Sequence, residues 1–248
     1  MVRIERVVDD IEARAIEAGY TPHIGESRQY WRDIILGVND GLVSIFLLVV
    51  GVVGGGLATR QVFLTAVAGA VAGAVSMAAG EYLATKSQDE VLEAELTLER
   101  SHLRDFRELE LAQLREMFLD MGISEDDVGG VVAAFNRSDE ALLIAMKSLE
   151  FGVVESERRS PYMAMVISGG LFLAGSLPSV LPFAFVTAPG FGLVLASLFT
   201  LVGLFAVGVM KASVAGTGRI MSGLENLVIA GIGGIIAWFV GDIVGSAF

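Results

Sequence analysis

The sequence contains no cysteine, and this absence excludes disulfide bonds and metal sites built on thiolates. The side chains left for metal binding are carboxylates, imidazoles and thioethers. Charge is also scarce: 19% of the residues are charged and 54% are hydrophobic, more apolar than an ordinary soluble domain. The 30 glycines and a mean hydropathy of +0.66 point the same way. The composition therefore predicts an integral membrane protein.

Long stretches without a charged residue set the number of membrane spans. A helix needs about 20 apolar residues to cross a bilayer. The longest uncharged stretch, residues 160–210, must therefore hold two spans, with a proline-containing turn between them. The expected fold class is all-α, with five transmembrane helices and a cytoplasmic three-helix acidic insert. The spans are expected at about 34–58, 61–86, 161–183, 188–210 and 222–246.

Lysine and arginine near the ends of the spans predict the orientation. An odd number of spans puts the termini on opposite sides of the membrane, so the positive-inside rule tests the count. With a cytoplasmic N-terminus, only Arg60 of the flanking cations lies outside. We therefore expect the N-terminus and the insert in the cytoplasm and the C-terminus outside. Residues 1–30 lack the apolar core of a cleavable signal peptide, so the first span is expected to direct insertion.

Apolar residues at helical spacing near the N-terminus favour an amphipathic helix on the cytoplasmic membrane surface. A short solvated helix packed on the rest of the protein is the alternative. The expected organisation is an N-terminal helix in 1–30, the first two spans in 31–86, the insert in 87–157 and the last three spans in 158–248.

All of the net negative charge comes from the insert. Residues 87–157 carry 18 Asp and Glu against 6 Lys and Arg, and the rest of the chain is balanced at 11 against 11. Apolar spacing and glycine breaks predict three helices there, at about 87–119, 124–136 and 138–157. Only Gly80 could interrupt a helix between Ser76 and Phe118, so the first is expected to continue the second span without a break.

Carboxylates in steps of three and four residues predict a metal site in the insert. Such steps place side chains on one stripe of a helix, where like charges repel and a bound cation would relieve the repulsion. A solvated acidic face is the alternative. A thioether and a carboxylate four residues apart on the last helix could complete a site that suits ferrous iron or manganese. The candidate insert ligands are Glu95, Glu99, His102, Glu110, Gln113, Glu116, Met146 and Glu150.

The spans themselves contain three candidate ligands. Asp40 interrupts an uncharged apolar run, and an acid at bilayer depth costs about 2.5 kcal/mol or more and usually lies on an ion pathway. Met77 stands on a stripe of glycines that lets another helix approach closely, and simple packing is the alternative for this residue. Glu81 follows one turn later, as a pathway ligand or as a carboxylate at the cytoplasmic end.

The chain resembles the vacuolar iron transporter family, to which a yeast vacuolar importer of iron and manganese belongs. The resemblance runs from about residue 28 onward and rests on four features: Arg32-Asp33 with Gly37-Val-Asn-Asp-Gly-Leu, Ser76-Met-Ala-Ala-Gly-Glu-Tyr-Leu, the acidic insert, and Glu225 opening a glycine-rich last span. It implies a transporter rather than an enzyme: a five-span homodimer with a pore between the protomers, exporting ferrous iron or related divalent ions from the cytosol in exchange for protons. The compact chain favours a bacterial or archaeal member in the plasma membrane; a eukaryotic member would act in the vacuolar membrane.

Position by position, the resemblance implies transport-path ligands at Asp40 and Met77. The insert ligands that it implies are Glu99, Glu110, Met146 and Glu150. Four positions depart from the family pattern: Gly69 replaces a pore glutamate, His102 and Gln113 replace insert glutamates, and Lys147 replaces a methionine. Glu81 or Asp33 then becomes the candidate for the proton-coupling residue.

The expected partners are a second copy of the chain, the lipid bilayer, divalent metal ions and protons, without nucleic acid or a resident cofactor. Fe²⁺, Mn²⁺, Co²⁺, Ni²⁺ and Zn²⁺ all accept these ligands. One alternative is a membrane-anchored metal buffer, against which Asp40 argues, because an anchor has no use for an intramembrane carboxylate. Another is a ferroxidase-like di-iron centre at the dimer interface, because Glu99-x-x-His102 has the spacing found in di-iron proteins. A surface histidine on a charged helix is the remaining alternative for His102.

Overall fold

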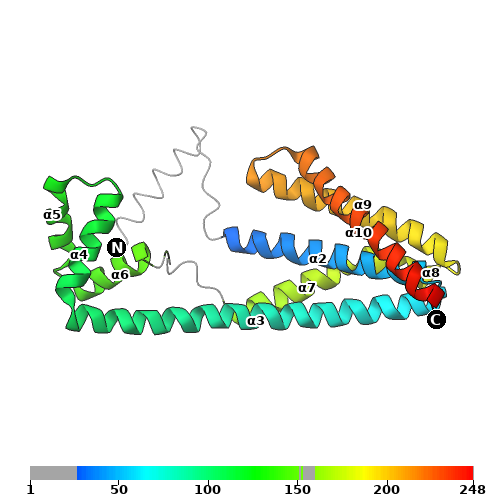
Figure 1. Cartoon of the computed structure of the whole chain (residues 1–248), viewed down its shortest axis with the longest axis horizontal. Helices are drawn as coiled ribbons and strands as arrows, with labels where there is room; N and C mark the ends of the chain where they lie inside the picture. The colour runs from blue at the N-terminus through cyan, green and yellow to red at the C-terminus, as the bar shows by residue number, and fades with distance from the viewer. Residues whose placement is uncertain (1–26, 151, 153–159, 248) are drawn as a thin grey trace, which may run out of the picture.

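The computed structural model describes residues 27–150, 152 and 160–247, and every regular element in this part of the chain is a helix (Figure 1). The all-helical expectation is therefore confirmed for these residues, while the predicted N-terminal amphipathic helix lies outside them. The helices are α2 (Ser27–Gly54), α3 (Thr59–Asp105), α4 (Arg107–Asp120), α5 (Glu125–Phe135), α6 (Asp139–Glu150), α7 (Pro161–Val180), α8 (Pro182–Phe185), α9 (Pro189–Ala215) and α10 (Arg219–Ala247).

Five of these helices, α2, α3, α7, α9 and α10, are long and apolar enough to cross a membrane. They coincide with the five predicted spans, although α2 ends at Gly54 and α7 ends at Val180, a few residues earlier than expected. Pro182 and Pro189 begin α8 and α9, where the missing N–H removes no helical hydrogen bond. The chain is thus an integral membrane protein built on an apolar helix bundle.

Within the bundle, α2 contacts α3, α7, α9 and α10. Glycines permit the closest approaches. A Cβ at Gly41 of α2 would collide with the carbonyl of Phe172 in α7, and a Cβ at Gly241 of α10 would collide with the carbonyl of Gly51 in α2. Helices in lipid lack a hydrophobic drive to associate, so close packing of small residues holds them together. Large apolar side chains on α9 and α10 remain exposed, as on a lipid-facing surface.

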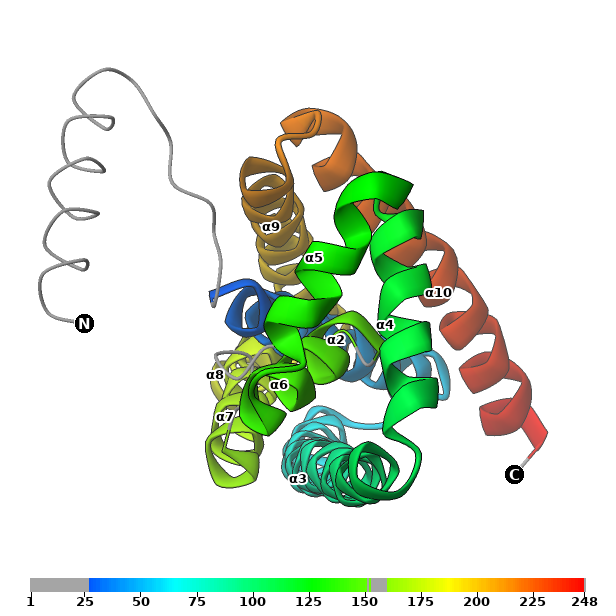
Figure 2. The same cartoon turned by 90° about the vertical axis from the view of Figure 1, so that its left-hand side faces the viewer.

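The longest helix, α3, has 47 residues and carries the insert away from the bundle (Figure 1). It continues the second span without interruption as far as Asp105, as expected. The prediction that it runs on to residue 119 is wrong, because the helix breaks at Phe106 (φ −134°, ψ 34°) and α4 begins at Arg107. A straight helix could not fold its own apolar face into a core, whereas the break lets α4 turn and pack with α5 and α6 (Figure 2).

The insert has a hydrophobic core of its own, separate from the core of the bundle. Leu103 of α3, Leu114 of α4, Val128 of α5 and Leu142 of α6 meet in it and are almost fully buried. Burying a Leu or Val side chain contributes roughly 1.5–3 kcal/mol, so these contacts hold the three short helices against α3. The last insert helix, predicted at 138–157, ends at Glu150 in the structure, and most of the remainder lies outside the described residues.

An arginine fastens the start of α4 to the turn before α6. Arg107 Nε donates a hydrogen bond of 2.8 Å to Asn136 Oδ1, and Nη1 donates one of 2.7 Å to Asp139 Oδ1. Nη2 also donates to the carbonyl of Asn136, at 3.1 Å. One side chain thus fixes the direction in which the chain leaves the break at Phe106.

Candidate functional site

Three predicted ligands meet where α4 turns back from the end of α3. Glu99 and His102 stand three residues apart on one face of α3, and Glu110 stands on the first turn of α4. Their ligand atoms all lie within 4.8 Å of one another. His102 Nδ1 is 3.4 Å from Glu110 Oε1 and 4.0 Å from Glu99 Oε2. The cluster offers two carboxylates and one imidazole, a donor set that suits a borderline divalent metal.

Burial makes this cluster electrostatically costly without a cation. Glu99 and Glu110 are only 4% and 3% exposed. Glu99 Oε1 and Glu110 Oε2 are buried without a hydrogen-bond partner in the described part of the chain, and such oxygens are costly to leave unpaired. Burial, and then the charge of Glu110, raise the pKa of Glu99 to about 7. A divalent ion would satisfy both oxygens and offset the repulsion.

The cluster opens into a cavity of about 310 Å³. Two further predicted ligands, Gln113 and Glu150, also line this cavity. The pKa of Glu150 is raised, first by desolvation and then by the charge of Glu110. Phe106 and Leu109 complete the lining and were not predicted. No motif marks these two residues, because the helix break alone brings them to the cavity.

The other predicted insert ligands lie elsewhere. Glu95 is exposed and does not line the cavity, although its charge helps to raise the pKa of Glu150. The Glu116 side chain is 73% exposed, and its Oε1 is 3.9 Å from Arg115 Nη1. Met146 is fully buried in the apolar core of the insert and is not among the cavity-lining residues. The ligand roles of these residues stay predictions.

In the bundle, Asp40 lies on the exposed surface of α2 and accepts a hydrogen bond of 2.9 Å from Ser44 Oγ, one turn later. Met77 is half-buried on α3, against the bundle core. Gly41 follows Asp40, and Gly73 lies one turn before Met77. A Cβ at either glycine would collide with Phe172 of α7. The carboxylate and the thioether therefore stand at a similar depth in the bundle.

The two candidate proton-coupling residues share one arginine. Arg32 Nη2 lies 3.3 Å from Asp33 Oδ1 and 3.5 Å from Glu81 Oε1, and Asp33 is only 2% exposed. This group joins the first turns of α2 to α3. At Gly69, one of the positions at which the sequence departs from the expected family pattern, the space for a side chain is filled by Leu48.

Comparison with known proteins agrees with the resemblance seen in the sequence. The model of the VIT family matches residues 31–242. The chain is 28% identical to vacuolar iron transporter 1 of Arabidopsis thaliana over 243 residues, which cover 98% of this chain and 97% of that protein. It is 30% identical to vacuolar iron transporter 1 of Eucalyptus grandis over 208 residues, covering 84% and 83% of the two chains. Protein CCC1 of Saccharomyces cerevisiae is 29% identical over 216 residues, covering 84% and 66%.

Proposed function

The chain belongs to the VIT family, and we propose that it carries ferrous iron out of the cytosol in exchange for protons. Iron as the substrate is supported by the names of the plant relatives, which are vacuolar iron transporters. Mn²⁺, Co²⁺, Ni²⁺ and Zn²⁺ accept the same ligands and are candidate further substrates. The chain acts as a transporter rather than an enzyme.

The observation that carries this proposal is the position of Asp40. Its carboxylate lies on the exposed surface of a helix that is long and apolar enough to span the membrane. A charge facing lipid at that depth is costly, so such groups face a protein interior or a water-filled path. A homodimer in which the two copies of Asp40 face a shared pore meets this requirement. Met77, at a similar depth, adds a soft ligand to the hard carboxylate.

The insert supports the same proposal from the cytosolic side. Its 12 excess negative charges raise the local concentration of cations, as single-sign surfaces do. The cluster of Glu99, His102 and Glu110 then offers a capture site. The continuous helix α3 joins this cluster to Met77. At the cytoplasmic end of the path, Glu81 and Asp33 are the proposed proton-coupling carboxylates, held by Arg32.

We place the N-terminus and the insert in the cytosol and the C-terminus outside, following the distribution of Lys and Arg. In the plasma membrane of a prokaryote this orientation gives efflux and detoxification. In a vacuolar membrane it gives storage.

Metal flux in proteoliposomes tests the proposal. Fe²⁺ would be supplied to proteoliposomes that contain the parent, Asp40→Asn or Asp242→Asn, under an imposed pH gradient. Metal flux and lumenal pH would be followed together. Asp242 is a matched control, because it is an exposed carboxylate on α10, another apolar helix. We expect coupled metal and proton flux in the parent and in Asp242→Asn. Asp40→Asn should lose the flux but keep its assembly.

The contrary result would be metal binding without flux in the parent. It would favour the second candidate, a membrane-anchored buffer or a ferroxidase-like di-iron centre, which the meeting of Glu99, His102 and Glu110 also supports. Oxidation of Fe²⁺ by dissolved oxygen separates these two, because only a ferroxidase should accelerate it above the rate for free Fe²⁺.

A further inference from the structure

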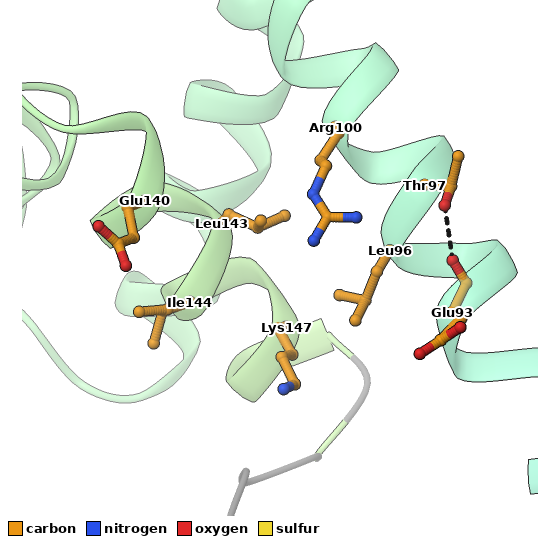
Figure 3. Close-up of a pocket in the computed structure, with 8 residues that line it drawn as sticks. All are labelled: Glu93, Leu96, Thr97, Arg100, Glu140, Leu143, Ile144 and Lys147. Carbon is orange, nitrogen blue, oxygen red and sulfur yellow. Dashed lines mark hydrogen bonds between the residues drawn. The ribbon is translucent and has the colours of Figure 1, made fainter. Parts of the chain in front are cut away.

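A second hollow of the insert lies between α3 and α6 (Figure 3). It has a volume of about 560 Å³ and shares no lining residue with the cavity at Glu99. Each helix contributes residues at positions i, i+3, i+4 and i+7, which fall on one face of a helix. Each set begins with a glutamate and ends with a cation. The sets are Glu93, Leu96, Thr97 and Arg100 on α3, and Glu140, Leu143, Ile144 and Lys147 on α6.

The hollow has the size and lining of a small-molecule site. Pockets that hold organic ligands have volumes of roughly 300–1,000 Å³ and combine apolar walls with a few polar groups. Here Leu96 from α3 and Leu143 from α6 point into the space between the helices, and Ile144 lies on α6 near Glu140 (Figure 3). A bare inorganic ion would leave this apolar wall uncovered, so the occupant needs an apolar body.

Arg100 supplies a cationic side chain that is not engaged by a carboxylate in the described part of the chain. Its guanidinium extends from α3 into the hollow (Figure 3). Arg104, Arg107 and Arg115 each hold a carboxylate. Arg100, in contrast, makes neither a hydrogen bond nor an ion pair with any residue in the described part of the chain. A guanidinium offers a planar fork of donors that matches a carboxylate or a phosphate.

Lys147 adds a second positive charge from α6. Its side chain belongs to the same lining, and the residue is only 9% exposed. Glu93 and Glu140 line the same hollow and would repel a second anionic group. The lining therefore selects a ligand with one charged end and one apolar end.

We propose that this hollow binds a small organic anion. Arg100 holds its carboxylate or phosphate group, Lys147 adds attraction, and its apolar body covers Leu96, Leu143 and Ile144. The same chemistry could come from a soluble molecule or from the headgroup of an anionic lipid. The α3 lining begins seven residues beyond the predicted end of the span at residue 86, about 10 Å along a helix, a position that favours the soluble source.

Calorimetric titration of the purified full chain in neutral detergent tests the proposal. The probe is phenyl phosphate, which has one dianionic end and one apolar end, and benzylammonium is the probe of opposite charge. We expect phenyl phosphate to bind and benzylammonium not to bind. Arg100→Gln should weaken phenyl phosphate binding about tenfold or more, as expected for a lost charge-assisted hydrogen bond. Lys147→Met, which keeps the apolar stem, should weaken it to a smaller extent.

Arg104→Gln is the matched control. It makes the same charge change one turn further along α3, at an arginine that does not line the hollow, and it should leave the affinity for phenyl phosphate unchanged. Three results would overturn the proposal: no binding of phenyl phosphate by the parent, equal affinity in Arg100→Gln and the parent, or tighter binding of benzylammonium.

The source of the anion is settled by repeating the titration in lipid nanodiscs. Nanodiscs of phosphatidylcholine alone should bind phenyl phosphate as the detergent-solubilised protein does. If added phosphatidylglycerol abolishes this binding, a lipid headgroup occupies the hollow, and if binding persists, the ligand is soluble. The readout involves neither iron nor flux, so it stands whatever the transport assay shows.

Discussion

At the scale of single residues, the buried carboxyl of Glu99 makes the metal-free insert sensitive to pH. Its pKa is raised from 4.5 to about 7, chiefly because burial disfavours the charged form. In the unfolded chain the group titrates near its ordinary value, so the folded insert binds more protons between about pH 4.5 and 7. The contribution of Glu99 to folding stability is therefore fully present below this window and is lost as the pH rises through it.

The same proton must leave before a metal binds at Glu99, which predicts a pH-dependent affinity. The affinity of the insert for Zn²⁺ should fall by about tenfold for each pH unit below 7 and level off above 7. Calorimetric titrations of the full chain between pH 5.5 and 8 measure this slope. Glu99→Gln should remove most of the binding, whereas Glu108→Gln, at an exposed position on α4, should leave the slope intact. An affinity that does not change with pH in the parent would contradict the role of Glu99.

At the scale of elements, the break at Phe106 brings together the cluster of Glu99, His102 and Glu110. In one straight helix, Glu110 would lie eight residues and about 12 Å beyond His102, too far to share an ion. After the break, His102 Nδ1 and Glu110 Oε1 are 3.4 Å apart. The direction of α4 after the break is held by Arg107, through its bonds to Asn136 and Asp139.

Arg107→Ala is therefore expected to loosen the insert and to weaken metal binding together. Hydrogen bonds to a charged group contribute about 1.5–3 kcal/mol, so amides in 107–150 should exchange faster by roughly tenfold or more. Hydrogen exchange with mass spectrometry is the appropriate measurement, because both tryptophans, Trp31 and Trp238, lie in membrane helices. Arg104→Gln serves as the control. Unchanged exchange in Arg107→Ala would show that the apolar core alone sets the direction of α4.

The sequence predicted the elements of the membrane part better than those of the insert. Uncharged stretches locate five spans because lipid imposes length and apolarity on each helix independently of its neighbours. The sequence carries no such signal for the break at Phe106, because neither glycine nor proline stands there. The break arises from the packing of α4 into the core of the insert. Of the predicted stripe, Glu99 and His102 meet because they share a helix face. Glu110 meets them only after the break, and Glu116 stays exposed.

At the scale of the whole molecule, the proposed capture site and the proposed transport ligands lie far apart. Met77 and Glu99 are 22 residues apart on the continuous helix α3, which corresponds to about 33 Å. An ion held at the insert cluster cannot be shared with the membrane ligands. On the proposed function, the insert would act by concentrating ions near the cytosolic entrance, and the rate of passage would depend on the bundle.

This arrangement requires the insert and the C-terminus to lie on opposite sides of the membrane, which site-directed labelling can measure. The chain has no cysteine, so each introduced cysteine is a unique target. Asp126→Cys on α5 and Ser246→Cys near the end of α10 both place the thiol at an exposed position. In intact host cells, an impermeant maleimide should label Ser246→Cys and should reach Asp126→Cys only after permeabilisation. Labelling of both cysteines from the same side would contradict five spans. Labelling of only Asp126→Cys in intact cells would place the insert outside and contradict the proposed direction of export.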